Sequence, residues 1–142
     1  MTTGIRVIIT KAGDVSAITT EPMHAVEPDE GEVRLKVAYA GINFADLLMR
    51  LGFYQPRPPF PFTPGYEVSG VVDALGKGVT GLEVGQRVVA AMRTGGQASF
   101  VNAPVDRVIP LPDGFSLQKA AATPVTYMTA HHMLHHLGHL QP

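Results

Sequence analysis

The 142-residue sequence contains no cysteine. It also lacks long runs of like charge and long apolar runs. Without cysteine the chain cannot form disulfides, use a thiol nucleophile or bind zinc or iron–sulfur clusters through thiolates. The net charge is −1 and no block of like charges occurs, which argues against nucleic-acid binding. No apolar run approaches the roughly 20 residues of a membrane span, and the first ten residues lack the layout of a signal peptide. We therefore expect a cytoplasmic protein.

Glycine and proline, by contrast, are abundant. Fifteen glycines and twelve prolines favour short strands and frequent turns over long helices. Residues 32–39 alternate, with Val33, Leu35, Val37 and Tyr39 on one face and charged residues on the other, which predicts a half-buried strand. Further strands are expected at residues 6–10, 66–75, 86–92, 98–102 and 107–109. This series of short strands indicates a β-barrel or sandwich.

One helix interrupts the strands. Apolar residues recur at helical spacing in residues 44–51, where Asn43 is suited to the N-cap and Gly52 to the end of the helix. The proline-rich segment 56–64 follows, and five prolines in nine residues predict a stiff extended loop.

The last quarter of the chain is different in character. Ser116 can cap a short helix that ends before Pro124, and a second helical pattern runs from Val125 to Leu137. The apolar face of this final helix comprises Tyr127, Ala130, Leu134 and Leu137. Because no later segment follows to cover this face, we expect it to be exposed or to support self-association.

The order of these segments resembles the medium-chain dehydrogenase/reductase superfamily, and within it the zinc-free quinone oxidoreductases with their vesicle amine transport protein-like branch. The motifs that carry the resemblance are Ala40-Gly-Ile-Asn-Phe-Ala-Asp46, Leu51-Gly-Phe-Tyr54, Thr63-Pro-Gly-Tyr-Glu-Val-Ser-Gly-Val-Val72, Gly85-Gln-Arg-Val88, Gly96-Gln-Ala-Ser-Phe100, Ile109-Pro-Leu-Pro112, Ala120-Ala-Ala122 and Tyr127-Met-Thr-Ala130. Each motif is weak alone, but their common order spans nearly the whole chain.

The resemblance implies a mainly β fold, a GroES-like partly open β-barrel with a few short helices, normally followed by a Rossmann domain that binds NADPH. The spacing Gly-x-Gly-x-x-Gly occurs at Gly76–Gly81, but this segment lies between two expected strands and opens no helix, so it is not a fingerprint for the cofactor phosphates. We therefore expect a truncated protein: an incomplete GroES-like substrate domain at residues 1–124, and a helix at residues 125–142 leading toward a missing Rossmann domain.

The resemblance also implies a metal-free site. Zinc-dependent relatives place a cysteine and a histidine where this chain has Asn43 and Tyr66, so no catalytic zinc is expected. By resemblance, Asn43 is catalytic and faces the nicotinamide, Tyr54 is catalytic and lines the substrate cleft with Tyr66 and Glu67, and Thr129 binds the cofactor. Structural alternatives remain open for four of them: a helix cap for Asn43, a rim aromatic for Tyr54, a hydrogen-bond acceptor for Glu67 and an ordinary helix residue for Thr129.

The function implied is hydride transfer from NADPH to a quinone or enone, with the isolated chain nearly inactive because the hydride donor has no binding domain. The alternative is a non-catalytic GroES-like module for binding or oligomerisation.

Five of the six histidines lie in the final helix or just after it. They form i,i+4 pairs at 131/135, 132/136 and 135/139, so a helix could offer two metal ligands on one face. However, no glutamate lies between the histidines of a pair and no third ligand is evident. The alternative to a metal site is an ordinary polar face of the helix.

Overall fold

Seven strands form the framework of the computed structural model, which describes residues 2–141. Met1 and Pro142, the outer ends of the two units expected from the sequence, lie outside the described residues. The strands are β1 (Thr3–Ile9), β2 (Ile18–His24), β3 (Glu32–Ala40), β4 (Glu67–Leu75), β5 (Arg87–Ala91), β6 (Phe100–Pro104) and β7 (Val108–Pro110). β1 pairs with β2, and the other five form one sheet in the order β6-β3-β4-β5-β7.

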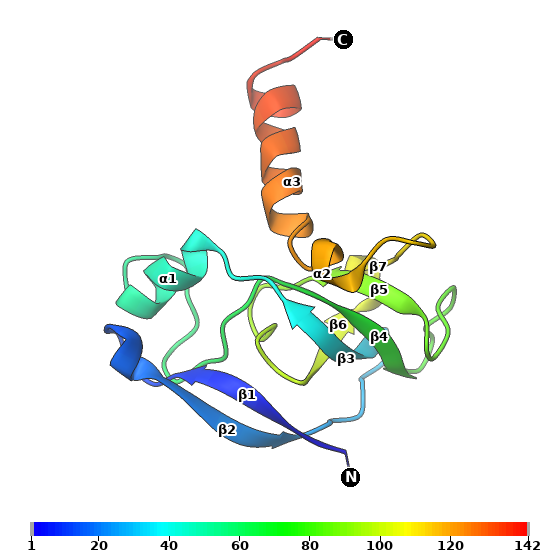
Figure 1. The fold of residues 1–142 in the computed structure, drawn as a ribbon, viewed down its shortest axis with the longest axis horizontal. Helices are drawn as coiled ribbons and strands as arrows, with labels where there is room; N and C mark the ends of the chain where they lie inside the picture. Colours follow the sequence, from blue (N-terminus) through cyan, green and yellow to red (C-terminus); the bar gives the residue numbers. More distant parts are fainter. Residues whose placement is uncertain (1, 142) are drawn as a thin grey trace.

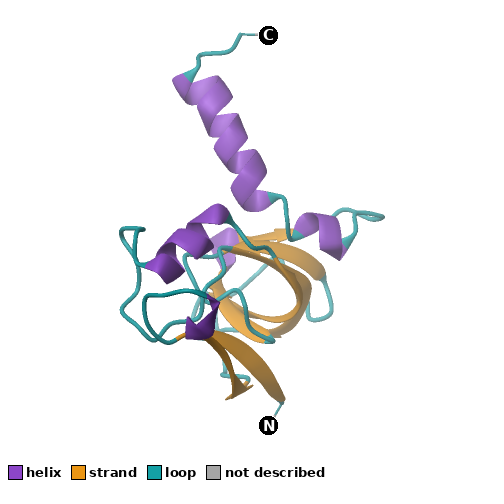
Figure 2. Cartoon of the chain, turned by 60° about the vertical axis from the view of Figure 1, so that its left-hand side comes forward, coloured by secondary structure: helices purple, strands orange, loops and turns teal. Residues whose placement is uncertain are grey.

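The five-stranded sheet curls around the main hydrophobic core (Figure 2). The alternation in β3 points Val33 and Leu35 inward, where both are fully buried, and Leu35 lies opposite Val72 of β4. Every strand pairing within residues 2–141 is antiparallel. The mainly β, partly open barrel predicted from the sequence is confirmed.

β2 is a strand that the sequence analysis missed. Its residues are almost all exposed and include Pro22, so they lack the alternation that marked β3. Proline is tolerated there because β2 has a single strand partner, β1, and lies at the edge of the sheet. The β1–β2 pair joins the rest of the fold through backbone hydrogen bonds between Ile9 and Phe62 and from the Val7 N–H to the Gln97 oxygen.

The helices occur where they were predicted. α1 (Phe44–Leu51) begins after Asn43 and ends at Gly52, whose positive φ of 84° favours glycine. α2 (Leu117–Ala120) is capped by Ser116, whose hydroxyl accepts a hydrogen bond from the Lys119 N–H. Two short 3-10 helices also occur: η1 (Val15–Ala17) lies between β1 and β2, and η2 (Val105–Arg107) lies between β6 and β7.

The final helix stands away from the barrel (Figure 1). It begins as α3 (Pro124–His131) and continues as a π-helix, η3 (His132–Leu137), before Gly138. The sequence placed its ends within one residue but predicted regular α-helix throughout. In a π-helix the hydrogen bonds span five residues instead of four, so the predicted face does not form one straight stripe.

Candidate functional site

Three elements meet at the carboxylate of Glu67, the first residue of β4. Its Oε1 atom accepts a hydrogen bond of 3.0 Å from Asn43 Nδ2, and its Oε2 atom accepts one of 2.9 Å from the Val125 N–H. Glu67 is only 2% exposed. Val125 lies in the first turn of α3, where free N–H groups and the helix dipole favour a negative charge. The buried carboxylate therefore ties the barrel to the start of α1 and of α3.

The antiparallel pairing of β3 with β4 explains how Glu67 reaches Asn43. The register places Ala40 opposite Val68, and the Gly41 N–H donates to the Glu67 carbonyl oxygen at 3.0 Å. A Cβ atom on Gly41 would collide with the Glu67 side chain and lie 2.6 Å from the Ala121 oxygen. Only glycine allows this close approach, which brings the α1 cap beside the carboxylate.

Asp46 fixes the beginning of α1. Its carboxylate accepts hydrogen bonds from the Asn43 N–H at 2.9 Å and from the Gly65 N–H at 3.0 Å. Burial raises the pKa of Asp46, and these two hydrogen bonds partly oppose the rise. Because Asp46 holds the Asn43 backbone, the Asn43 side chain is free to turn toward Glu67.

Tyr54 and Tyr66 come together in a second cluster next to α1. Both pack against the buried side chains of Ile9, Met49 and Phe62. The Tyr66 hydroxyl donates to Met49 Sδ at 3.7 Å. Burial, with the neighbouring Tyr54 hydroxyl as the next cause, raises the pKa of Tyr66 to about 12. This phenol is therefore protonated at neutral pH and acts as a hydrogen-bond donor.

Thr129 lies away from both groups. It is exposed on α3, four residues beyond Val125, and makes no side-chain hydrogen bond with the part of the chain that is described. The structure thus joins Asn43 to Glu67 and Tyr54 to Tyr66, and leaves Thr129 on the projecting helix.

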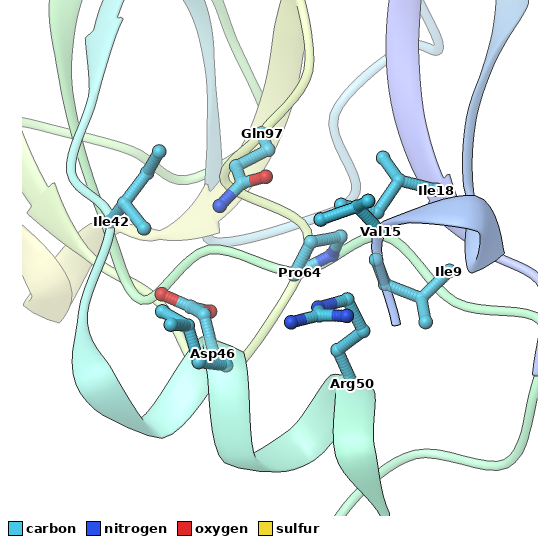
Figure 3. A pocket seen from close by; sticks show the side chains of 9 residues that line it. Ile9, Val15, Ile18, Ile42, Asp46, Arg50, Pro64 and Gln97 are labelled. Atoms are coloured by element: carbon cyan, nitrogen blue, oxygen red, sulfur yellow. The ribbon is translucent and has the colours of Figure 1, made fainter. Parts of the chain in front are cut away.

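A pocket of about 220 Å³ opens on the side of α1 that faces β1 (Figure 3). Asp46 and Arg50, one helical turn apart, point into it, and Gln97 lies across from them. Its remaining walls are apolar and come from Ile9, Val15, Ile18, Ile42, Leu47 and Pro64. The sequence analysis missed this pocket. The i,i+4 spacing of Asp46 and Arg50 was a readable signal, but nothing local indicated that Gln97 would face them.

Two further searches concern metals and membranes. Within residues 2–141, no three histidine, aspartate or glutamate side chains are arranged to hold a metal ion. No helix in the same range has the length and apolar character needed to cross a membrane.

Comparison with known proteins identifies the family to which the chain belongs. Residues 29–113 match the family model of the alcohol dehydrogenase GroES-like domain. The chain is 36% identical over 135 residues to the mouse synaptic vesicle membrane protein VAT-1 homolog-like, covering 95% of this chain and 32% of that protein. It therefore spans about a third of the length of this curated relative.

Solved structures give the same result. The human VAT-1 homolog-like protein superposes with a TM-score of 0.95 at 35% identity, over 99% of this chain and 45% of that one. Escherichia coli quinone oxidoreductase complexed with NADPH superposes with a TM-score of 0.83 at 30% identity, over 92% of this chain and 40% of that one.

Proposed function

The chain belongs to the alcohol dehydrogenase GroES-like domain family of the medium-chain dehydrogenase/reductases, and on this basis we propose that it is the substrate-binding half of an NADPH-dependent oxidoreductase. The reaction is hydride transfer to a quinone or enone without catalytic zinc. The observation that carries the proposal is the hydrogen bond from Asn43 to the buried Glu67 carboxylate, because it fixes the orientation of the amide group that we propose to face the nicotinamide.

NADPH would supply the hydride when bound, and this chain fits the nicotinamide end of the cofactor. Since Asn43 Nδ2 is held by Glu67, the Asn43 amide is fixed where α1 begins. Its Oδ1 atom would accept a hydrogen bond from the carboxamide of a nicotinamide ring. Thr129, exposed on α3, offers a hydroxyl for the same group.

The described residues do not fit the phosphate end. A pyrophosphate site of the Rossmann type needs a glycine-rich turn between a parallel strand and a helix, whereas all strand pairs within residues 2–141 are antiparallel. We assign phosphate binding to a separate cofactor domain. Residues 1–124 then form the substrate unit, and residues 125–142 form the connection to the cofactor domain.

Zinc does not fit this donor set. Asn43 offers a neutral amide that is already bound to Glu67. Tyr66 offers a phenol whose pKa is raised to about 12, so it does not supply a phenolate ligand at neutral pH. No step of the proposed reaction therefore passes through a metal.

The substrate side is formed by the Tyr54–Tyr66 pair. Tyr66 stays protonated, and its present acceptor, Met49 Sδ, is a weak one. A substrate carbonyl oxygen is a stronger acceptor than a thioether, and a donor aimed at it stabilises the negative charge that develops as hydride arrives. Tyr54 contributes the second hydroxyl and an aromatic wall for a flat quinone.

Quinone binding by the chain itself is the first test. Addition of 9,10-phenanthrenequinone to isotope-labelled chain should shift the NMR signals of the Asn43 side-chain amide and of Tyr54. The Asn102 side-chain amide, which donates to the Val26 and Glu27 carbonyl oxygens, serves as the internal control. Shifts confined to surface residues far from Asn43 would contradict the proposal.

Turnover requires a cofactor domain, so the second test is a chimera in which this chain replaces the matching segment of Escherichia coli quinone oxidoreductase. We expect NADPH-dependent quinone reduction that Asn43→Ala lowers about 10- to 100-fold and Asn102→Ala leaves within about twofold. A chimera that binds NADPH normally but reduces neither quinone nor enone would contradict the proposed reaction.

The exposed apolar residues of the final helix favour a second candidate function, self-association of a non-catalytic module. Tyr127, Leu134 and Leu137 are 70%, 51% and 67% exposed. Light scattering distinguishes the candidates: a dimer that Leu134→Glu converts to monomer supports the module, and a monomer at all concentrations opposes it.

A further inference from the structure

We propose that His131 and His135 bind one divalent transition-metal ion on the exposed face of the final helix. The two residues lie four positions apart, so their side chains lie on the same face, one turn apart. His131 ends α3 and His135 lies in η3, and both are exposed. Nothing in the proposed hydride transfer uses these side chains.

The ring geometry matches a pair of imidazoles bound to one ion. Zinc binds histidine nitrogen at about 2 Å, so two imidazoles on neighbouring coordination positions hold their ring centroids roughly 4.5 to 5 Å apart. The His131 and His135 centroids are 4.6 Å apart and the rings are tilted by 39°. The pair needs little rearrangement to coordinate.

The neighbouring histidines fit less well. The His132 and His136 rings are 5.2 Å apart but stacked at 27°, so they lie more nearly face to face. The His136 ring centroid also lies 6.1 Å from that of His131, farther apart than two ligands on neighbouring coordination positions. With two imidazoles from the protein, the ion would complete its coordination with water.

The chemistry of the donors selects the ion. No aspartate or glutamate occurs in residues 124–137, so the site offers neutral nitrogen ligands only. Imidazole suits copper, zinc and nickel, whereas magnesium and calcium prefer carboxylate and carbonyl oxygen. We expect Cu²⁺ to bind more tightly than Zn²⁺, and Mg²⁺ not to bind.

The test is calorimetric titration of the untagged 142-residue chain with CuCl₂, ZnCl₂ and MgCl₂. His131→Gln and His135→Gln should each weaken Zn²⁺ binding by about tenfold or more, because each leaves a single imidazole. His132→Gln and His139→Gln are the matched controls and should change the affinity by no more than about twofold. A Cu²⁺ complex should show two equatorial nitrogen ligands by electron paramagnetic resonance.

Two results would overturn the site. Equal weakening by all four substitutions would mean adventitious capture by a histidine-rich segment with no defined pair. Unchanged binding in both His131→Gln and His135→Gln would place the ion elsewhere. Hydrogen exchange adds an independent measurement: Zn²⁺ should slow exchange of the amides between His131 and His135 in the natural chain and not in His135→Gln.

Discussion

The barrel and the final helix both carry large apolar side chains, but the surroundings of these side chains are very different. In the barrel, Val33 and Leu35 are completely buried because β3 has a paired strand on each side and a curved sheet around it. In the final helix, Leu134 and Leu137 remain more than half exposed. The comparison shows that apolar side chains become buried only when another element of the fold packs against them.

Glu67 lies where the two regions meet. Its carboxylate accepts the Val125 N–H at the start of α3 and the Asn43 side chain at the start of α1. Beyond this first turn, α3 and η3 extend away from the barrel (Figure 1). The same carboxylate thus marks the end of the packed barrel and holds the proposed catalytic amide.

The largest contrast is expected from matched leucine truncations. Leu35→Ala should lower the free energy of unfolding by about 3 kcal/mol, because it opens a cavity among fully buried strands. Leu134→Ala, at a half-exposed position, should cost less than about 0.5 kcal/mol. Urea unfolding measures both values. Similar losses in the two variants would mean that the final helix is packed in solution.

The contact between β3 and the segment before α3 can be broken at one glycine. Gly41→Ala would drive a Cβ atom into the Glu67 side chain and toward the Ala121 oxygen, and should cost about 2 to 3 kcal/mol. Gly13→Ala is the control, since its Cβ would meet only Ala17 Cβ at 3.7 Å, and should change stability by less than about 0.5 kcal/mol. Equal stability of the two variants in urea would rule out the tight contact at Gly41.

Removal of the shared carboxylate should have a smaller but more specific effect. Glu67→Ala leaves Asn43 Nδ2 and the Val125 N–H without their acceptor and should cost about 2 kcal/mol. Hydrogen exchange of the Val125 amide should accelerate more than that of core amides in β3. Glu83→Ala, on an exposed turn, is the control and should change neither quantity.

A separate prediction concerns the pH dependence of stability. Because the pKa of Tyr66 is raised from 10.0 to about 12, the stability contributed by its protonated phenol is complete below pH 10 and is lost as the pH rises toward 12. Tyr66→Phe removes this dependence, so the difference in stability between natural chain and variant should change over that interval. Parallel stability curves for the two proteins would contradict the shift.

The local elements were predictable because their signals are local. Alternation marked β3, and Asn43 with Gly52 bounded α1. β2 was not predicted because an exposed edge strand needs no alternation of apolar and polar residues. The π-helix at residues 132–137 was not predicted because the sequence patterns assume the α-helical period. No contact among the described residues explains it.

The candidate site was predictable only in part. The resemblance supplied Asn43, Tyr54, Tyr66, Glu67 and Thr129 as candidates, and their roles remain proposals. Once β3 is paired with β4, the nearness of Asn43 and Glu67 follows from the register. The hydrogen bond from the Val125 N–H to Glu67, 58 residues away, depends on the path of the chain after β7. No local sequence pattern predicts that path.

We propose that this chain binds the substrate and that a separate domain binds the cofactor phosphates. The most direct test is a fluorescence titration of the 142-residue chain with NADPH, followed by a quinone-dependent NADPH oxidation assay. Our account predicts no saturable binding and no turnover above the protein-free rate, because the described residues offer no pyrophosphate site. Micromolar binding together with turnover would contradict it, since the barrel would then hold the cofactor and the acceptor without a second domain.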